Sequence, residues 1–364
     1  MKKLNLKIGS TFSGIGAFEY ALNKMKIDHD LIFACDIDKF CKQSYFANFD
    51  IDENNWFDDI KDIDGKNYKN KVDIITGGTP CQSFSMVGKR KGFEDTRGTL
   101  FYDFANLIKD VQPKCFIFEN VKGLISHDKG RTFERILEVF QQDLGYDVYY
   151  KVLNSRDYGI PQNRERIFVI GFKEKTNFEM PKSVKLESVM QDFLEDNFDS
   201  KYFLPEKGID FVTKEKNLTK RFTQIDGEIA LCQKANQQFN WHGDFIIENQ
   251  RMIPEKYYLS EKVKKYVMSS GTKNFYSKPK IDLDVARPII STMHKMHRAG
   301  VDNYITGELG IRKLTPRECL RLMGFGDDFK IEVSDTQMYR QAGNSIVVNI
   351  LIALTKEILK STKF

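Results

Sequence analysis

The chain has 364 residues, which by length alone is enough for about two domains with a substantial core. Its hydrophobic content of 41% and charged content of 29% are those of an ordinary soluble globular protein. The formal net charge of +5 is too small to indicate a polyanionic partner by itself.

Several classes of protein are excluded by what the sequence lacks. We find no apolar run close to the roughly 18 residues of a membrane span, and the N-terminus has no apolar signal segment. The six cysteines show no C-x-x-C spacing, so neither a zinc site nor a disulfide framework is predicted, and the five histidines form no H-E-x-x-H pattern. We therefore expect a cytoplasmic protein without membrane attachment and without a metal.

The first elements indicate a nucleoside-containing cofactor. Residues 4–12 predict a short strand, and 13–18 predict a turn into a helix that carries half of a G-x-G-x-x-G fingerprint. The next strand, 31–35, ends at Asp36, which follows Gly16 by 20 residues. At this distance a dinucleotide-type fold places an acid on a ribose diol. No Gly-rich cradle with a Lys is present, so a phosphate-bearing cofactor is less favoured.

A cysteine follows the next apolar run. Residues 72–75 predict a buried parallel strand, and the loop 77–85 places Cys81 at the carboxyl end of that strand, where open α/β sheets bind ligands. Pro80 restricts the backbone before the thiol, while Gly77 and Gly78 permit close approach to a ligand. Cys81 is therefore a candidate nucleophile, although most free cysteines are simply small buried apolar residues.

A carboxyl group emerges beside this loop in the predicted topology. The polar segment 89–98 has the composition of a mobile active-site loop, and a helix is predicted over 100–110. The apolar strand 114–118 then ends at Glu119. This residue either N-caps the following helix or is directed into the same crevice as Cys81.

The remaining pattern predicts a helix over 132–144, strands over 146–153 and 167–172, and a loop carrying Arg164 and Arg166 before the last of these. Residues two apart line one side of a strand, so the two guanidinium groups would suit a phosphate or a base carbonyl. A helix is predicted to start at Thr315 and Pro316, and a final helix over 346–358 follows a turn at 341–344.

After about residue 190 the β-α periodicity fades, and 195–310 is interpreted as a second domain. Within it, residues 251–280 hold eight basic against two acidic side chains, with five aromatic residues interleaved. This mixture is expected beside nucleic acid, and a solvated basic helix with a tyrosine-rich inner face explains it equally well.

Taken in order, the motifs resemble those of the DNA (cytosine-5) methyltransferase family, particularly its compact bacterial restriction–modification enzymes. The resemblance covers nearly the whole chain and depends most on the Pro-Cys-Gln, Glu-Asn-Val and Gln-x-Arg-x-Arg motifs. The matching stretches are 12–18, 78–85, 97–101, 119–123, 162–166, 312–318 and 343–345. Residues of roughly 195–310 correspond by position to the family's variable target recognition domain.

The resemblance implies a fold and a reaction. The fold is α/β, a Rossmann-like S-adenosylmethionine-dependent methyltransferase sheet with helices on both faces, plus a smaller irregular or β-rich target recognition domain. The catalytic domain would comprise 1–190 and 338–364, and 191–337 would form the recognition domain and hinge. The activity would be site-specific DNA (cytosine-5) methylation, through a covalent adduct between Cys81 and C6 of a flipped-out cytosine.

Roles follow residue by residue from the same resemblance. The implied catalytic residues are Cys81, Glu119, Arg164 and Arg166, with Glu119 donating a proton to N3 of the base. The implied cofactor residues are Phe18, Asp36, Ile37, Asp59, Ile60, Pro80, Leu100, Asn344 and Ser345. Among these, Phe18 would lie against adenine, Asp36 on the ribose, Asp59 and Ile60 around the adenine edge, and Leu100 and Asn344 would close the pocket. The implied DNA contacts are Gln82, Ser85, Lys89, Arg90, Lys91 and Arg97.

We expect double-stranded DNA as substrate, a monomer, and a cognate restriction endonuclease that acts separately. Three alternatives stay open: a tRNA cytosine-5 methyltransferase of the same fold, a catalytically inactive DNA-binding protein, and a cysteine hydrolase. The inactive protein is disfavoured because Cys81 and Glu119 are both present, and the hydrolase because the closest His in sequence is His127. The recognition sequence, and whether the enzyme serves a host or a phage, do not follow from the sequence.

Overall fold

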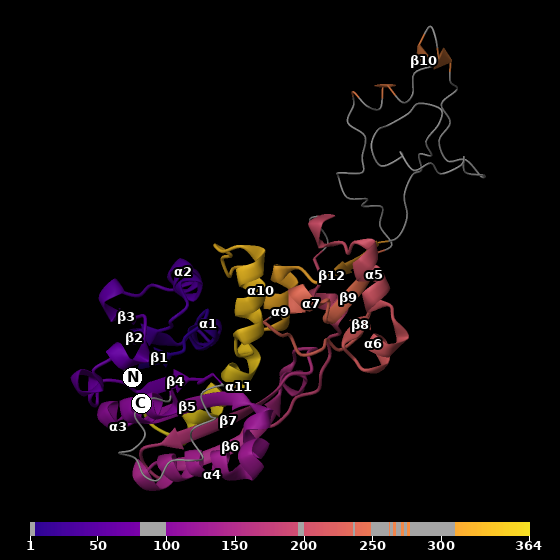
Figure 1. Ribbon diagram of the computed structural model, residues 1–364. Helices are drawn as coiled ribbons and strands as arrows, with labels where there is room; N and C mark the ends of the chain where they lie inside the picture. Colours follow the sequence, from indigo (N-terminus) through magenta and orange to yellow (C-terminus); the bar gives the residue numbers. More distant parts are fainter. Residues whose placement is uncertain are drawn as a thin grey trace. The chain divides into compact units, whose positions relative to one another are not determined.

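The chain forms two compact units. A computed structural model describes residues 4–80, 100–195, 200–235, 237–248 and 310–364, with short pieces at 262, 265–266, 271–272 and 275–276 (Figure 1). The first unit comprises Met1–Glu195, Gly227–Gly243 and Pro316–Phe364. The second comprises Asp196–Asp226 and Asp244–Thr315.

The first unit is built on a seven-stranded sheet in the order β3-β2-β1-β4-β5-β7-β6. Its strands β3, β2, β1, β4 and β5 pair in parallel, whereas β7 lies antiparallel between β5 and β6. The strand bounds are β1 (Asn5–Thr11), β2 (Asp28–Cys35), β3 (Trp56–Phe57), β4 (Ile74–Gly77), β5 (Cys115–Val121), β6 (Asp147–Asn154) and β7 (Glu165–Phe172). The Rossmann-like α/β class predicted from the sequence is confirmed.

The central strands are apolar because both sides of the sheet are covered. Ile74, Ile75 and Phe116 are fully buried, as expected for parallel strands between helices. An aromatic cluster packs helices against β5, with the rings of Phe116 and Phe140 only 4.5 Å apart between centroids. The helices of the first unit are α1 (Ala17–Lys24), α2 (Lys39–Asn48), α3 (Leu100–Val111), α4 (Arg131–Glu138), α7 (Gln237–Asn240), α9 (Pro316–Leu322), α10 (Asp335–Asn344) and α11 (Val348–Ser361).

Most predicted elements lie within a few residues of the observed ones, but the C-terminal region differs. The turn predicted at 341–344 is wrong, because these residues form the last turn of α10. The chain leaves the helix only at Ser345, and α11 begins at Val348 rather than near 346. Gly343 occupies a helical position and marks no turn, and a neighbouring backbone approaches it too closely for a side chain.

The segment Asp335–Ser361 has a length that would suit a membrane span, and its most apolar 18-residue window has a mean hydropathy of 1.4. It consists of two helices, α10 and α11, separated by a break at residues 345–347. Of its most apolar window, 56% is buried inside the protein, and Leu351, Leu354 and Ile358 are fully buried. These features are those of core helices.

The second unit contains a three-stranded sheet in the order β12-β9-β8 and a two-stranded ribbon. Among its described residues, the elements are α5 (Glu206–Val212), α6 (Glu215–Thr219), β8 (Thr223–Ile225), β9 (Gly243–Glu248), β10 (Gly271–Thr272), β11 (Phe275–Tyr276) and β12 (Gly310–Lys313). Its extent differs from the predicted domain 191–337. Helix α9 packs against α10, and segment 227–243 packs against the first unit, so both belong to that unit.

Candidate active site

The loops that follow β1 and β2 are joined by a carboxylate. The backbone N–H of Gly14 donates to Asp36 Oδ2 over 2.8 Å, and that of Asp38 donates to Asp36 Oδ1 over 2.9 Å. Burial raises the pKa of Asp36, while these two backbone hydrogen bonds lower it. Gly14 and Gly16 have φ of +56° and +76°, which favour glycine.

A small cavity of about 50 Å³ opens at these strand ends. It lies between the turn after β1, the end of β4 and the junction of α10 with α11. Three of the predicted cofactor residues, Phe18, Asn344 and Ser345, line it. A Cβ at Gly14 would meet no atom closer than 4.0 Å, so space remains above this turn. An apolar ring, an acid and a glycine turn together fit a nucleoside-containing cofactor.

The other predicted cofactor residues lie around this site in different environments. Ile37 is 81% exposed, and Asp59 caps a short 3-10 helix by accepting from Lys61 N over 3.0 Å. Ile60 is buried in the core cluster, so its side chain is a packing residue and only its backbone could contact a ligand. Pro80 is exposed, and Leu100 begins α3 with its side chain partly buried against the core.

Glu119 lies on β5 and is held by Arg166. The Arg166 Nε is 3.2 Å from Glu119 Oε1, and the two side chains are only 16% and 13% exposed. Burial raises the pKa of Glu119, and the positive charges of Arg166 and Arg164 oppose this shift. The net shift of the pKa is upward, so the site favours the protonated carboxyl more than water does.

The loop that leads to Cys81 is hydrogen-bonded to β5, the strand that carries Glu119. A Cβ on Gly78 would lie 3.0 Å from Glu119 Oε2, and Asn120 Nδ2 donates to Thr79 O over 2.7 Å. The backbone up to Pro80 is thus fixed beside the carboxyl. The predicted residues Cys81, Gln82, Ser85, Lys89, Arg90, Lys91 and Arg97 lie outside the described residues.

Arg164 has different partners from Arg166. Its Nη1 donates to Gln233 O over 2.9 Å, and its Nη2 donates to Gly343 O and Ser345 O over 2.9 and 2.7 Å. Burial lowers the pKa of Arg164 to about 10, so the group stays charged at neutral pH. The guanidinium therefore binds main-chain carbonyls, and among the described residues only Arg166 pairs with Glu119.

Gln162 belongs to the same arrangement and was not singled out from the sequence. It is fully buried, its Nε2 donates to Leu322 O over 2.8 Å, and its Oε1 accepts from Gln233 N over 3.1 Å. The signal was present in the Gln-x-Arg-x-Arg spacing. Its partners are 71 and 160 residues away, which no local pattern reveals.

Gly343 permits this assembly because it lacks a side chain. A Cβ there would lie 2.4 Å from Ala235 N and 2.6 Å from Lys234 C, and backbone atoms cannot easily move.

We expect Gly343→Ala to lower the free energy of unfolding by about 1–3 kcal/mol, as overpacking does. Thermal denaturation measures this. Gly123→Ala, where a Cβ meets nothing within 4 Å, is the control, and equal melting temperatures for both variants would contradict the packing argument.

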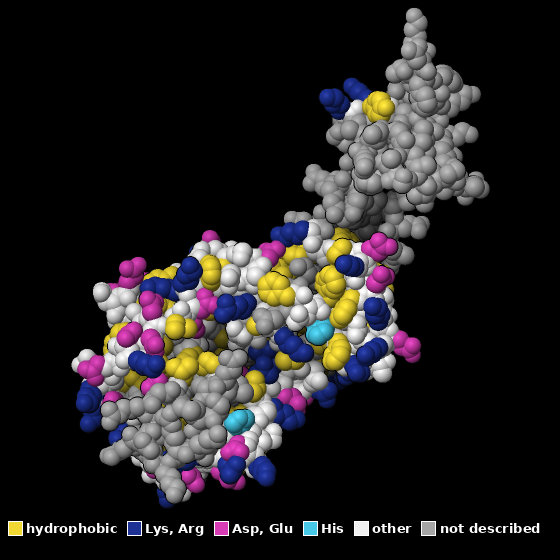
Figure 2. Space-filling view, in the orientation of Figure 1, with side chains coloured by type: hydrophobic (Ala, Val, Ile, Leu, Met, Phe, Trp, Pro, Cys, Tyr) yellow, Lys and Arg dark blue, Asp and Glu magenta, His cyan; other side chains and the backbone are white. Residues whose placement is uncertain are grey.

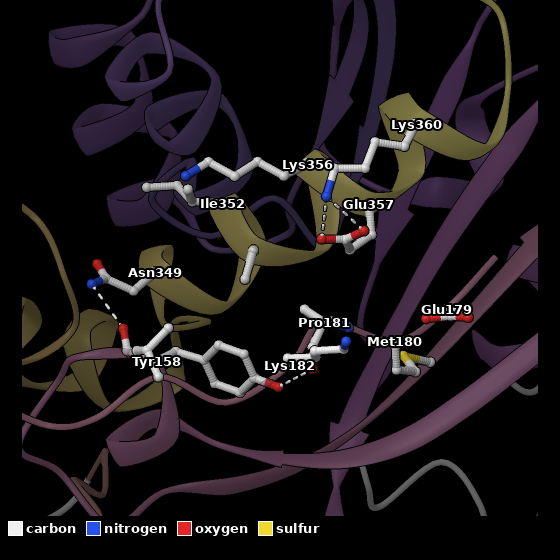
Figure 3. A pocket seen from close by; sticks show the side chains of 12 residues that line it. Tyr158, Glu179, Met180, Pro181, Lys182, Asn349, Ile352, Lys356, Glu357 and Lys360 are labelled. Carbon is white, nitrogen blue, oxygen red and sulfur yellow. Dashed lines mark hydrogen bonds and ion pairs between the residues drawn. The ribbon is translucent and has the colours of Figure 1, made fainter.

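A larger hollow of about 570 Å³ lies between α11, Tyr158 and segment 179–184 (Figure 3). Lys360 pairs with Glu357 there, and Tyr158 donates to Pro181 O. None of the predicted site residues lines it. In the part of the chain that the structure describes, no group of three or more His, Cys, Asp or Glu side chains could hold a metal.

Charge on the described surface is mixed. Figure 2 shows Lys and Arg side chains interspersed with Asp and Glu over the visible face. Several basic side chains on this surface are paired with acids, for example Lys122 with Glu165 and Arg321 with Asp327. The basic segment 251–280 lies almost entirely outside the described residues, so its predicted phosphate contacts stay a prediction.

Comparison with known proteins assigns the family. The family model for C-5 cytosine-specific DNA methylases matches residues 6–360, and the chain belongs to this family. It is 36% identical to the type II methyltransferase M.NgoBI of Neisseria gonorrhoeae, covering 95% of this chain and 90% of that protein. It is 31% identical to the orphan methyltransferase M.SPRI of Bacillus phage SPR, with 97% of each covered. The predicted family is confirmed, and S-adenosylmethionine use follows from it.

Solved structures agree on the fold. The methyltransferase EhMeth of Entamoeba histolytica matches with a TM-score of 0.67 at 17% identity, covering 99% of both chains. DNMT2 of Spodoptera frugiperda matches with a TM-score of 0.66 at 20% identity, covering 97% of this chain and 99% of that one. At these identities the likeness supports the fold and nothing finer.

Proposed function

We propose that the protein is a site-specific DNA (cytosine-5) methyltransferase that acts in the cytoplasm as a monomer, and that it is the modification enzyme of a restriction–modification system. The observation that carries this proposal is the placement of Glu119. Its carboxyl pairs with Arg166 and lies against Gly78, three residues before Cys81. An acid and a nucleophile from neighbouring strand ends are what addition to a pyrimidine ring requires.

The chemistry follows from the substrate. Cytosine C5 is a poor nucleophile, so its methylation requires loss of aromaticity. The Cys81 thiolate adds to C6, and the protonated Glu119 carboxyl donates its proton to N3, which leaves an enamine that is nucleophilic at C5. After methylation a water molecule takes the C5 proton, the Cys81 thiolate leaves C6, and N3 returns its proton to Glu119, which restores the ring. Arg166 would orient Glu119 throughout, because its Nε lies 3.2 Å from the carboxylate.

S-adenosylmethionine would supply the methyl group as an electrophilic sulfonium. Phe18, Asn344 and Ser345 would contact one part of it from the small cavity that they line, and Asp36 would bind the ribose with lone pairs left after its two backbone hydrogen bonds. The pair Asp59 and Ile60 would contact the adenine edge, the latter through its backbone. No metal is required for this reaction.

DNA is preferred over tRNA as the substrate. The relatives M.NgoBI and M.HpaII, the latter from Haemophilus parainfluenzae and 35% identical, carry the name type II methyltransferase. A separate second unit also fits a reader of base edges in a duplex. A cytosine in a duplex must be flipped out to reach Cys81, at a cost of a few kcal/mol.

The test is incubation of purified protein with methyl-labelled S-adenosylmethionine and either mixed-sequence duplex DNA or total tRNA, followed by nucleoside analysis. We expect label in 5-methylcytosine from DNA, and sequencing of the product would then give the recognition site. Label in tRNA alone would replace the DNA proposal with its closest alternative. Cofactor binding without transfer to either substrate would contradict a methyltransferase active on these nucleic acids.

A further inference from the structure

The segment 227–243 connects the two units in sequence, and it docks on the residues that precede β7. The backbone N–H of Asn163 donates to Ala230 O over 2.8 Å, and that of Ala230 donates to Pro161 O over 2.7 Å. This connector is part of the first unit and continues into β9, most of which belongs to the second unit.

One residue of the connector, Gln233, has both of its main-chain groups held by buried side chains. Its N–H donates to Gln162 Oε1 over 3.1 Å, and its carbonyl accepts from Arg164 Nη1 over 2.9 Å. The side chains of Gln162 and Arg164 are 0% and 2% exposed. A buried cation needs this number of acceptors, because leaving it without them is strongly unfavourable.

The other nitrogen of the same guanidinium binds the end of α10. Arg164 Nη2 donates to Gly343 O and Ser345 O, which lie where a helix leaves its last carbonyls without intrahelical partners. A cation is also favourable at a helix C-terminus. Ser345 and its neighbour Asn344 line the cavity assigned to the cofactor. One planar, rigid group thus joins the cofactor cavity to the connector.

We infer that Arg164 is a positioning residue that couples occupancy of the cofactor cavity to the ordering of connector 227–243. This inference depends on the proposed function for the identity of the cofactor. A ligand that orders Asn344 and Ser345 fixes two of the carbonyls that Arg164 binds. The third carbonyl, on Gln233, is then held by a guanidinium that has lost its freedom to reorient.

The test uses hydrogen–deuterium exchange with S-adenosylhomocysteine as the probe, in the full-length protein and without DNA. The reporters are the hydrogen-bonded amides of Ala230, Gln233 and Lys234, compared with those of 341–346. In the wild type, saturating probe should slow exchange about fivefold or more in both regions, the low end of ordinary coupling between sites. Protection confined to 341–346 would overturn the inference and leave the cofactor assignment intact.

Variants separate coupling from simple structural support. Arg164→Met should bind the probe and protect 341–346, but lose protection at 230–234. Arg164→Lys keeps the positive charge but replaces the planar guanidinium with a single ammonium group. We therefore expect only partial protection of the amides at 230–234. A merely structural residue would instead lower the melting temperature and leave the folded molecules with wild-type protection in both regions. Should the Met variant fail to fold, the wild-type and Lys measurements still decide.

Arg156→Met is the matched control. Arg156 lies eight residues earlier in a 3-10 helix (Ser155–Tyr158), and its exposed side chain is paired with Asp157 at 3.5 Å. Protection in both regions should survive this change. Failure of the wild type to bind the probe at all would contradict the cofactor assignment itself, which distinguishes that outcome from loss of coupling.

Discussion

Glu119→Gln is expected to lower kcat by about 10² to 10⁴-fold, the range over which a positioned general acid contributes. Gln has nearly the shape of Glu and can still accept from Arg166, so the site should keep its geometry. It cannot deliver a proton to N3 of the base. The affinities for duplex DNA and for S-adenosylhomocysteine should stay within about twofold, roughly 0.4 kcal/mol. Single-turnover methyl transfer and equilibrium binding measure these quantities separately.

Glu165→Gln is the matched control for this experiment. Glu165 lies between Arg164 and Arg166 in the motif and at the start of β7, but it is paired on the surface with Lys122 at 2.9 Å. Glu165→Gln removes a carboxylate identical to that of Glu119 at a position close to the site. We expect an unchanged rate, and a wild-type rate for Glu119→Gln would mean that another group donates the proton.

The pH dependence of methyl transfer should also report the protonation of Glu119. Burial raises the folded-state pKa of Glu119, whereas Arg166 and Arg164 lower it, and the net direction is upward. The protonated, reactive form is therefore retained to higher pH than for an ordinary glutamate. Its stabilisation of the fold is fully present below the unfolded pKa and is lost as pH rises through the folded pKa. The rate of methyl transfer should therefore fall as pH rises through the raised pKa of Glu119, and this loss on the alkaline side should be absent in Glu119→Gln.

Much of the sheet could be predicted because its strands are short apolar runs bounded by turn residues. Ile74 and Ile75 on β4 and Phe116 on β5 are buried on both sides, and such strands differ from their polar surroundings in composition alone. Asp36 and Glu119 could be placed for the same reason, since each ends or nearly ends such a run. The antiparallel insertion of β7 between β5 and β6 could not be predicted, because strand order is a long-range property.

The role of Arg164 shows where local spacing stops being informative. Two arginines two residues apart were expected to face one ligand, as they would inside a strand. Strand β7 begins at Glu165, however, so Arg164 lies outside the regular ladder and its backbone N–H is bound by the side chain of Asn154. Its guanidinium reaches carbonyls 69, 179 and 181 residues away. Only the assembled fold brings these together.

The helical position of Gly343 has a related explanation. Gly followed by Asn is a frequent turn signal, and the sequence supplies no reason to continue a helix through it. In the structure Gly343 continues α10, and the backbone of Lys234 and Ala235 packs where a side chain would stand. The glycine is therefore explained by this tertiary contact and not by a turn.

Cys81→Ser is expected to reduce methyl transfer by about 10³-fold or more, because the whole reaction depends on covalent addition to C6. A serine hydroxyl has almost the same size, but its proton is far harder to remove than that of a thiol. Binding of S-adenosylhomocysteine should be unaffected, since the cavity lined by Phe18, Asn344 and Ser345 is formed by other residues. The variant therefore separates the nucleophile from the cofactor site.

A duplex containing 5-fluorocytosine makes the covalent step visible. Fluorine at C5 cannot leave as a proton, so the ring cannot be restored and the protein stays joined to DNA through the Cys81 sulfur. The wild type with S-adenosylmethionine should give a complex that survives denaturation, and Cys81→Ser should give none. Cys41→Ala, which removes a buried thiol on α2, should still form it. A stable complex from Cys81→Ser would place the nucleophile on another residue, and the fixed approach of Gly78 and Thr79 to Glu119 and Asn120 would then need a different explanation.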